Sequence, residues 1–155
     1  MSVIPVEHEE SFYKLFDYIY KNDAEAVHVS MELVQIAHVW DDLIDKDVEV
    51  SDKEINAAFV GALCEVGGSP LWDRQAAELL RIQFFKWLAA NKIEQTPDAT
   101  TEQKMVAYAA RAGFYELFYY FAFKLHGVEW AASVAPVIAS WYGESAEDYM
   151  LEFWR

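Results

Sequence analysis

The chain has few of the residues that interrupt helices. Its 155 residues include only six Gly, four Pro and one Cys. So few glycines and prolines argue against a turn-rich β-sandwich or barrel. The single cysteine excludes an internal disulfide framework and a cysteine-based zinc site. Cys64 lies beside Leu63 and Val66 in a predicted helix, so we expect its thiol to be buried.

Positive charge is also scarce. The chain carries 12 Lys and Arg against 26 Asp and Glu, a formal net charge of −14. We therefore expect no direct nucleic-acid binding, because duplex affinity comes largely from Lys and Arg at phosphates. The negative charge suits a protein that binds cations or a basic partner. Hydrophobic residues make up 54% of the chain, which argues against intrinsic disorder.

Long apolar runs are missing. The nearest approach, residues 106–125, is interrupted by Arg111, Glu116 and Lys124, so we expect no membrane span. The first residues have neither a basic region nor a long apolar run, and we expect no signal peptide. A cytoplasmic protein is therefore the expectation.

Helical patterns run through almost the whole sequence. They predict an all-α fold, with residues 1–155 forming a single-domain helical bundle of five to seven helices. Ser51 and Glu54 have the spacing of a capping box, Ser69-Pro70 has the pattern of a helix start, and Thr100 with Gln103 can cap a later helix. We expect Gly127 to end that helix, and Pro136 and Gly143 to disturb the next. The predicted helices span about 9–21, 23–46, 51–67, 70–90, 100–125 and 129–154.

An acidic stripe lies at the end of the second predicted helix. His38, Asp41, Asp42 and Asp45 fall within an arc of about 100° on one helix face. Carboxylates so placed repel each other and oppose the helix dipole. A bound Mg²⁺ would remove that conflict, since Mg²⁺ prefers oxygen ligands. The alternative is a solvated helix end that holds no metal.

A second acidic group lies near the C-terminus. Glu144, Asp148 and Glu152 are spaced at i, i+4 and i+8, within an arc of about 80°. They form either the ordinary polar face of a terminal helix or, if both acidic groups meet at one end of the bundle, part of a metal site.

Arg111 is surrounded in the sequence by apolar residues and needs a partner, because an unpaired buried charge is costly. Glu116, a carboxylate of another helix or a bound diphosphate could fill that role. The aromatic residues that follow, among them Phe114 and Tyr115, form either packed core or the lining of a site for an apolar chain or a carbocation. This aromatic stripe comprises Phe114, Tyr115, Phe118, Tyr119, Phe121 and Phe123.

The segment from Glu32 to Asp45, E-L-V-Q-I-A-H-V-W-D-D-L-I-D, resembles the first aspartate-rich motif, DDxxD, of the class I isoprenoid synthases, which include trans-prenyltransferases and terpene cyclases. This resemblance implies an isoprenoid-synthase-like fold in which Asp41 and Asp45, with Asp42 adjacent, hold Mg²⁺ bound to an isoprenyl diphosphate.

The second acidic group is similar in spacing to the second metal motif of the cyclases, (N/D)xxx(S/T)xxxE. Glu144 stands for Asn or Asp, Asp148 stands for Ser or Thr, and Glu152 matches. Arg111 loosely resembles the arginine with which these enzymes sense the diphosphate. His38 lies a few residues before the first motif, as in the family.

Two functions follow from the sequence. The first is Mg²⁺-dependent binding or turnover of an isoprenyl diphosphate; His38, Arg111, Phe114 and Tyr115 would then contact the substrate. The second is a non-catalytic acidic helical protein that binds a basic protein partner, imitates nucleic acid or forms a homodimer. A lesser enzymatic alternative, nucleotide pyrophosphate hydrolysis, rests on the acidic pairs Asp42/Asp45 and Glu144/Glu147.

Overall fold

A computed structural model describes residues 6–111, 115–141 and 145–154, and every regular element in these ranges is a helix. The all-α prediction is therefore confirmed for the described residues. None of their helices has the length and apolar character needed to cross a membrane. In chain order the elements are α1 (Val6–Ile19), α2 (Ala24–Asp45), α3 (Asp52–Val60), the π-helix η1 (Gly61–Val66), α4 (Arg74–Glu94), α5 (Thr101–Arg111), α6 (Tyr115–Ala139) and α7 (Ala146–Phe153).

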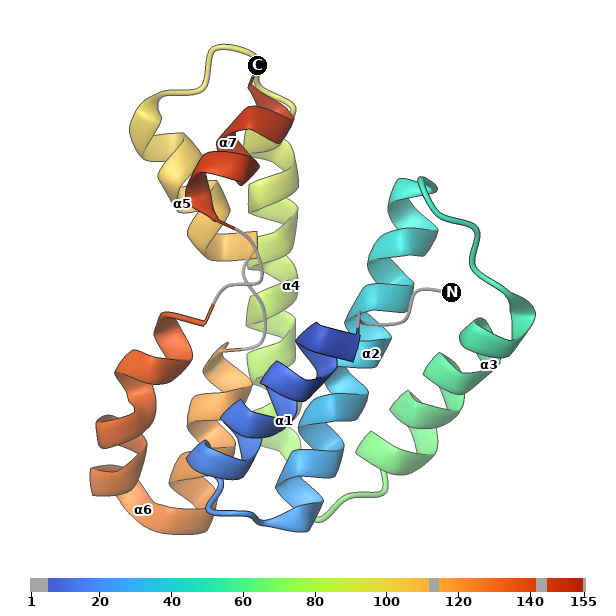
Figure 1. The fold of residues 1–155 in the computed structure, drawn as a ribbon, viewed down its shortest axis with the longest axis vertical. Coiled ribbons are helices and arrows are strands. Elements are labelled where there is room, and N and C mark those ends of the chain that lie inside the picture. Colours follow the sequence, from blue (N-terminus) through green and yellow to red (C-terminus); the bar gives the residue numbers. More distant parts are fainter. Residues whose placement is uncertain (1–5, 112–114, 142–144, 155) are drawn as a thin grey trace.

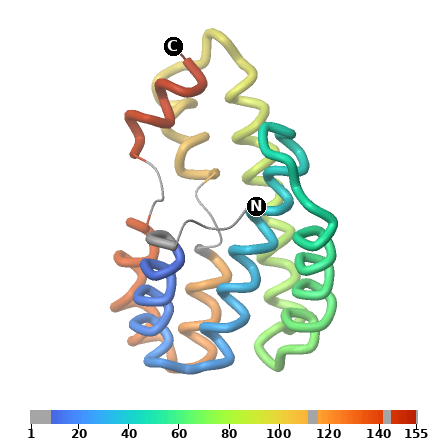
Figure 2. Tube along the Cα trace, turned by 45° about the vertical axis from the view of Figure 1, so that its right-hand side comes forward, coloured from blue at the N-terminus to red at the C-terminus, as the bar shows by residue number. Residues whose placement is uncertain are grey.

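Helix α4 runs along most of the molecule and joins two groups of helices (Figure 1). At one end α1, α2 and α6 pack together, with α3 and η1 alongside α2. At the other end α5 and α7 pack around the second half of α4 (Figure 2). Each group has its own hydrophobic cluster.

The larger cluster is built around stacked aromatic rings. The ring of Phe16 lies 5.8 Å from that of Tyr20 and 5.0 Å from that of Phe118. Phe121 is fully buried and contacts Tyr20, and the Tyr20 hydroxyl is hydrogen-bonded to Ser30 Oγ at 2.8 Å. Within the predicted aromatic stripe, Phe118 and Phe121 are therefore packed core, whereas Phe123 is exposed.

Several helix ends lie where the sequence predicts them. Ser51 and Glu54 form the capping box of α3, and the Thr100 hydroxyl and the Gln103 side chain each accept a backbone N–H of the other residue. Gly127, at φ 85°, breaks the helical path inside α6, a conformation that glycine adopts without strain.

Several local predictions are wrong. Helix α4 begins at Arg74 rather than Pro70, because Asp73 forms its N-cap while Ser69 Oγ accepts Leu71 N–H in the preceding turn. Pro136 lies inside α6, which continues to Ala139. Cys64 is exposed rather than buried, since η1 is a π-helix that turns Gly61 and Val66 inward instead. Gly143 lies outside the described residues.

Asp73 ties the start of α4 to α6. Its carboxylate accepts Ala76 N–H at 3.0 Å, the Tyr120 hydroxyl at 2.5 Å and Lys124 Nζ at 2.9 Å. These hydrogen bonds hold the pKa of Asp73 well below its usual range, and the same contact raises the pKa of Tyr120 to about 12.

We expect Asp73→Ala to lower the free energy of unfolding by about 2–4 kcal/mol at pH 7, through the loss of a helix cap and of hydrogen bonds to a charged group. Because the pKa of Asp73 is lowered in the fold, its contribution is present at neutral pH and fades as pH falls below the ordinary carboxyl range. Urea unfolding at pH 7 and pH 3 measures both effects. Tyr120→Phe should lower the free energy of unfolding by only about 1 kcal/mol. If both variants lose the same free energy, Asp73 does not stabilise the fold beyond its hydrogen bond with Tyr120.

Candidate acidic site around Arg111

Arg111, the last residue of α5, lies where the C-terminal ends of α2 and α4 meet α5. Its Nη1 donates to Asn91 Oδ1 at 2.7 Å and lies 3.4 Å from Glu94 Oε2. Its Nη2 lies 3.8 Å from both Asp41 Oδ1 and Asp45 Oδ2. The sequence-based expectation that Arg111 needs a carboxylate from another helix is thus met from two helices, whereas Glu116 pairs with Lys86.

The capping of α2 sets the positions of the two aspartates. Asp23 forms the N-cap, and Lys46, in the left-handed conformation, ends the helix with its N–H on the carbonyl oxygen of Asp42. Asp41 and Asp45 lie four residues apart, about one turn, and therefore share a face. Both carboxylates are within 3.8 Å of the same nitrogen atom of Arg111, so they converge on one point.

Glu94 is the buried member of the group, with its side chain only 6% exposed. It accepts the Tyr149 hydroxyl at 2.6 Å, which ties α7 to the end of α4. Burial raises the pKa of Glu94, and the charges of Glu152 and Asp45 add to the rise, while Tyr149 and Arg111 oppose it. Glu152 of α7 therefore lies close enough to act on this site.

The site carries more negative charge than Arg111 neutralises. Partial burial raises the pKa of Asp41, and the charges of Asp45 and Asp42 raise it further, against the opposing effects of Arg111 and His38. Several carboxylates thus act on one another around a single guanidinium. The side chains of Asp41 and Asp45 are 63% and 47% exposed, and solvent reaches this side of the site.

The structure brings together part of the predicted site. Asp41, Asp45 and Arg111 are in direct proximity, and Asp42, His38 and Glu152 lie within electrostatic range of the group.

Asp148 has a different role. It is exposed, its backbone N–H donates to Ser145 Oγ at 3.1 Å, and its carboxylate accepts the Ser145 hydroxyl, so it stabilises the start of α7. Glu144, Phe114 and the side chain of Tyr115 lie outside the described residues. Among the described residues, no three His, Cys, Asp or Glu side chains form a group arranged to hold a metal ion.

Sequence reasoning missed Glu94, Asn91 and Tyr149. The predicted fourth helix stops near residue 90, which puts Asn91 and Glu94 in a loop, whereas α4 continues to Glu94. The signal that could have found them is the lack of any helix-breaking residue before Thr96-Pro97. Tyr149 follows Asp148 in the sequence but points to the other side of α7, where it is buried.

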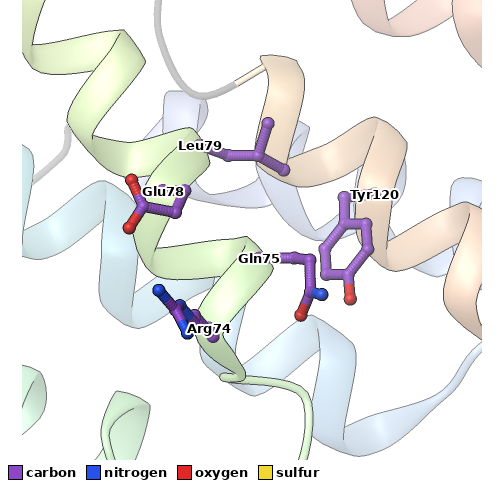
Figure 3. A pocket seen from close by; sticks show the side chains of 5 residues that line it. All are labelled: Arg74, Gln75, Glu78, Leu79 and Tyr120. Carbon is purple, nitrogen blue, oxygen red and sulfur yellow. The ribbon is translucent and has the colours of Figure 1, made fainter.

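A separate hollow of about 370 Å³ lies at the other end of α4 (Figure 3). It is lined by Arg74, Gln75, Glu78, Leu79 and Tyr120, and Gln75 and Tyr120 lie side by side in it. These residues belong to the first turns of α4 and to α6, whereas Glu94 is the last residue of α4. At 1.5 Å per residue the two places are about 25–30 Å apart along α4, so the hollow is not part of the acidic site.

No protein family, curated protein or solved structure gives a significant match to this chain. The described residues form an all-α fold, and its acidic site is centred on Arg111, where α2, α4 and α5 meet.

Proposed function

We propose that the acidic site around Arg111 binds Mg²⁺ together with the diphosphate group of a small-molecule ligand. The observation that carries this proposal is the convergence of Asp41 and Asp45 on one nitrogen atom of Arg111, with the buried Glu94 on the other. An arginine beside two accessible carboxylates combines a direct donor to phosphate oxygens with ligands for a metal that bridges to them.

The residues fit Mg²⁺ because this ion needs few protein ligands. It is usually held by one or two carboxylates, several waters and the phosphates of the substrate, so a ready-made group of three ligands is not required. Asp41 and Asp45 would supply those carboxylates. When bound, the ion would offset the carboxylate repulsion that adds to the effect of burial on the pKa of Asp41 and of Glu94, and it would polarise the phosphate oxygens.

Arg111 is suited to the diphosphate itself. Its contacts with Asp41, Asp45 and Glu94 are 3.4–3.8 Å long, longer than the 2.7–2.9 Å typical of charge-assisted hydrogen bonds. A phosphate group would give the guanidinium shorter hydrogen bonds to two of its oxygens. Meanwhile the 2.7 Å bond to Asn91 keeps Arg111 at the end of α4.

The resemblance to class I isoprenoid synthases suggests an isoprenyl diphosphate as the ligand. Phe118 and Phe121 are packed into the core against Phe16 and Tyr20. The proposal therefore rests on recognition of the diphosphate end, and turnover is not part of it.

Thermal melting with Mg²⁺ and inorganic diphosphate tests this proposal. We expect both ligands together, at a hundredfold excess over the dissociation constant, to raise the melting temperature by about 5–10 °C. Mg²⁺ alone, or diphosphate alone with EDTA present, should raise the melting temperature less.

The variant Asp41→Asn/Asp45→Asn should abolish that shift. Glu10→Gln/Asp17→Asn on α1 removes the same number of charges from two other exposed positions and should keep it. A wild-type protein whose melting temperature does not change with both ligands present would refute the proposal. So would an equal shift in the aspartate variant.

A further inference from the structure

An aromatic cluster joins α2 to α4 directly beside the acidic site. The Trp40 ring stacks on that of Phe84 with centroids 5.9 Å apart and meets the Trp87 ring edge-on at the same distance. Phe85 contacts Phe84 at 6.1 Å. Trp40 precedes Asp41 in the chain, and Trp87 lies one turn before Asn91, the hydrogen-bond partner of Arg111.

The outer side of this cluster is open to solvent. Phe85 is 60% exposed and Ile44 is 62% exposed, and Trp40, Leu43 and Leu88 are each more than two-fifths exposed. We call these five residues the α2–α4 apolar surface. Scattered exposed apolar side chains are normal, but residues grouped around one aromatic cluster mark an interaction site.

Carboxylates predominate at the α2 edge of this surface. Asp41 and Asp45 adjoin Trp40 and Ile44 in the sequence, and both lie at a site with excess negative charge. Two nearby cations of α4 pair with carboxylates, Arg81 with Glu78 and Lys86 with Glu116, whereas Lys92 is exposed one turn beyond Leu88. A partner that covers the apolar surface therefore meets carboxylates at its edge.

We propose that the α2–α4 apolar surface binds an amphipathic helical segment of another protein, with apolar side chains against Phe85, Leu88 and Trp40 and Lys or Arg toward Asp41 and Asp45. Helix-in-groove recognition places apolar anchors one turn apart against such a surface. A second copy of this chain is the poorer occupant, because pairing would bring two net charges of −14 together. This proposal does not depend on Mg²⁺ or diphosphate.

A labelled model peptide tests the proposal by fluorescence anisotropy, in EDTA so that the result is independent of the cation site. The probe is an 18-residue Leu/Lys amphipathic helix; its Leu/Glu and Ser/Lys counterparts are the comparison peptides. We expect binding of the Leu/Lys peptide alone, weakened at least tenfold by Phe85→Ser/Leu88→Ser and severalfold by Asp41→Asn/Asp45→Asn or by raised salt.

The matched control is Phe123→Ser/Val128→Ser, which changes two exposed apolar residues of α6 and should leave the affinity within twofold. Equal losses in the two serine variants, or equally tight binding of the Leu/Glu or Ser/Lys peptide, would overturn the proposal. Analytical sedimentation gives a further test. If the wild-type chain is a dimer and Phe85→Ser/Leu88→Ser is a monomer, the occupant of this surface is a second copy and the proposal is overturned.

Discussion

Replacing Arg111 with Met should lower the free energy of unfolding by about 2–3 kcal/mol at pH 7. Removing one partner of a buried ion pair costs about 3–5 kcal/mol, and the 27% exposure of the Arg111 side chain reduces that figure. Glu94 bears most of the loss, because it is the least exposed carboxylate of the group and would keep only the Tyr149 hydroxyl. Chemical unfolding of wild type and variant measures the difference.

The pH dependence of this loss distinguishes an electrostatic effect from a packing effect. The pKa of Glu94 is raised in the fold, so its contribution to stability is present below the ordinary carboxyl pKa of about 4 and is lost as pH rises through its folded value. Without Arg111, the ionisation of Glu94 should lower the stability of the fold by a larger amount. The gap between wild type and Arg111→Met should therefore narrow from pH 7 toward pH 4.

Arg81→Met is the matched control for this experiment. Arg81 forms only an exposed pair with Glu78 on α4, and its replacement should cost no more than about 0.5 kcal/mol with little change between pH 7 and pH 4. A gap for Arg111→Met that stays constant across this range would contradict an electrostatic role at Glu94.

Replacing Tyr149 with Ala should be more damaging, at about 3–5 kcal/mol. Tyr149 is 1% exposed and packs against Tyr108, Phe153 and Trp154, and its hydroxyl binds Glu94. Helix α7 has eight residues, too few to persist without tertiary packing. We expect α7 to detach, which hydrogen exchange would detect as faster exchange in residues 146–153 than in α2.

Two further variants serve as controls for Tyr149→Ala. Tyr149→Phe keeps the ring and removes the hydrogen bond to Glu94, so it should cost about 1–2 kcal/mol and leave α7 protected. Tyr13→Ala, at an exposed position of α1, should change stability by about 0.5 kcal/mol. If Tyr149→Ala leaves exchange in α7 unchanged, Tyr149 does not anchor this helix.

The sequence predicts the helices well because their signals are local. The capping box at Ser51, the side-chain cap at Thr100 and the break at Gly127 depend on residues a few positions apart. The sequence pattern predicts the wrong start of α4, because a contact with another helix decides which residue forms the N-cap. Asp73 rather than Ser69 begins α4, because its carboxylate also binds Tyr120 and Lys124 of α6.

The candidate site was predictable only in part for the same reason. The spacing of Asp41 and Asp45 places them on one face, and the apolar surroundings of Arg111 indicate that it needs a partner. The proximity of Asp41 and Asp45 to Arg111 depends on tertiary packing. The extension of α4 beyond residue 90 has a local signal, the lack of a helix breaker before Thr96. The burial of Glu94 also depends on the docking of Tyr149 from α7, which no local pattern encodes.

The most direct measurement of the central claim is electron paramagnetic resonance of Mn²⁺, which takes the same kinds of oxygen ligands as Mg²⁺. Free Mn²⁺ gives a strong signal that broadens on binding, so the spectrum counts bound ions. We expect wild-type protein to bind Mn²⁺ more tightly with diphosphate than without, and Mg²⁺ to displace it. Affinity should fall at least tenfold in Asp41→Asn/Asp45→Asn and stay unchanged in Glu10→Gln/Asp17→Asn. Equal Mn²⁺ binding by the two double variants would show that Asp41 and Asp45 hold no cation and would contradict the proposed site.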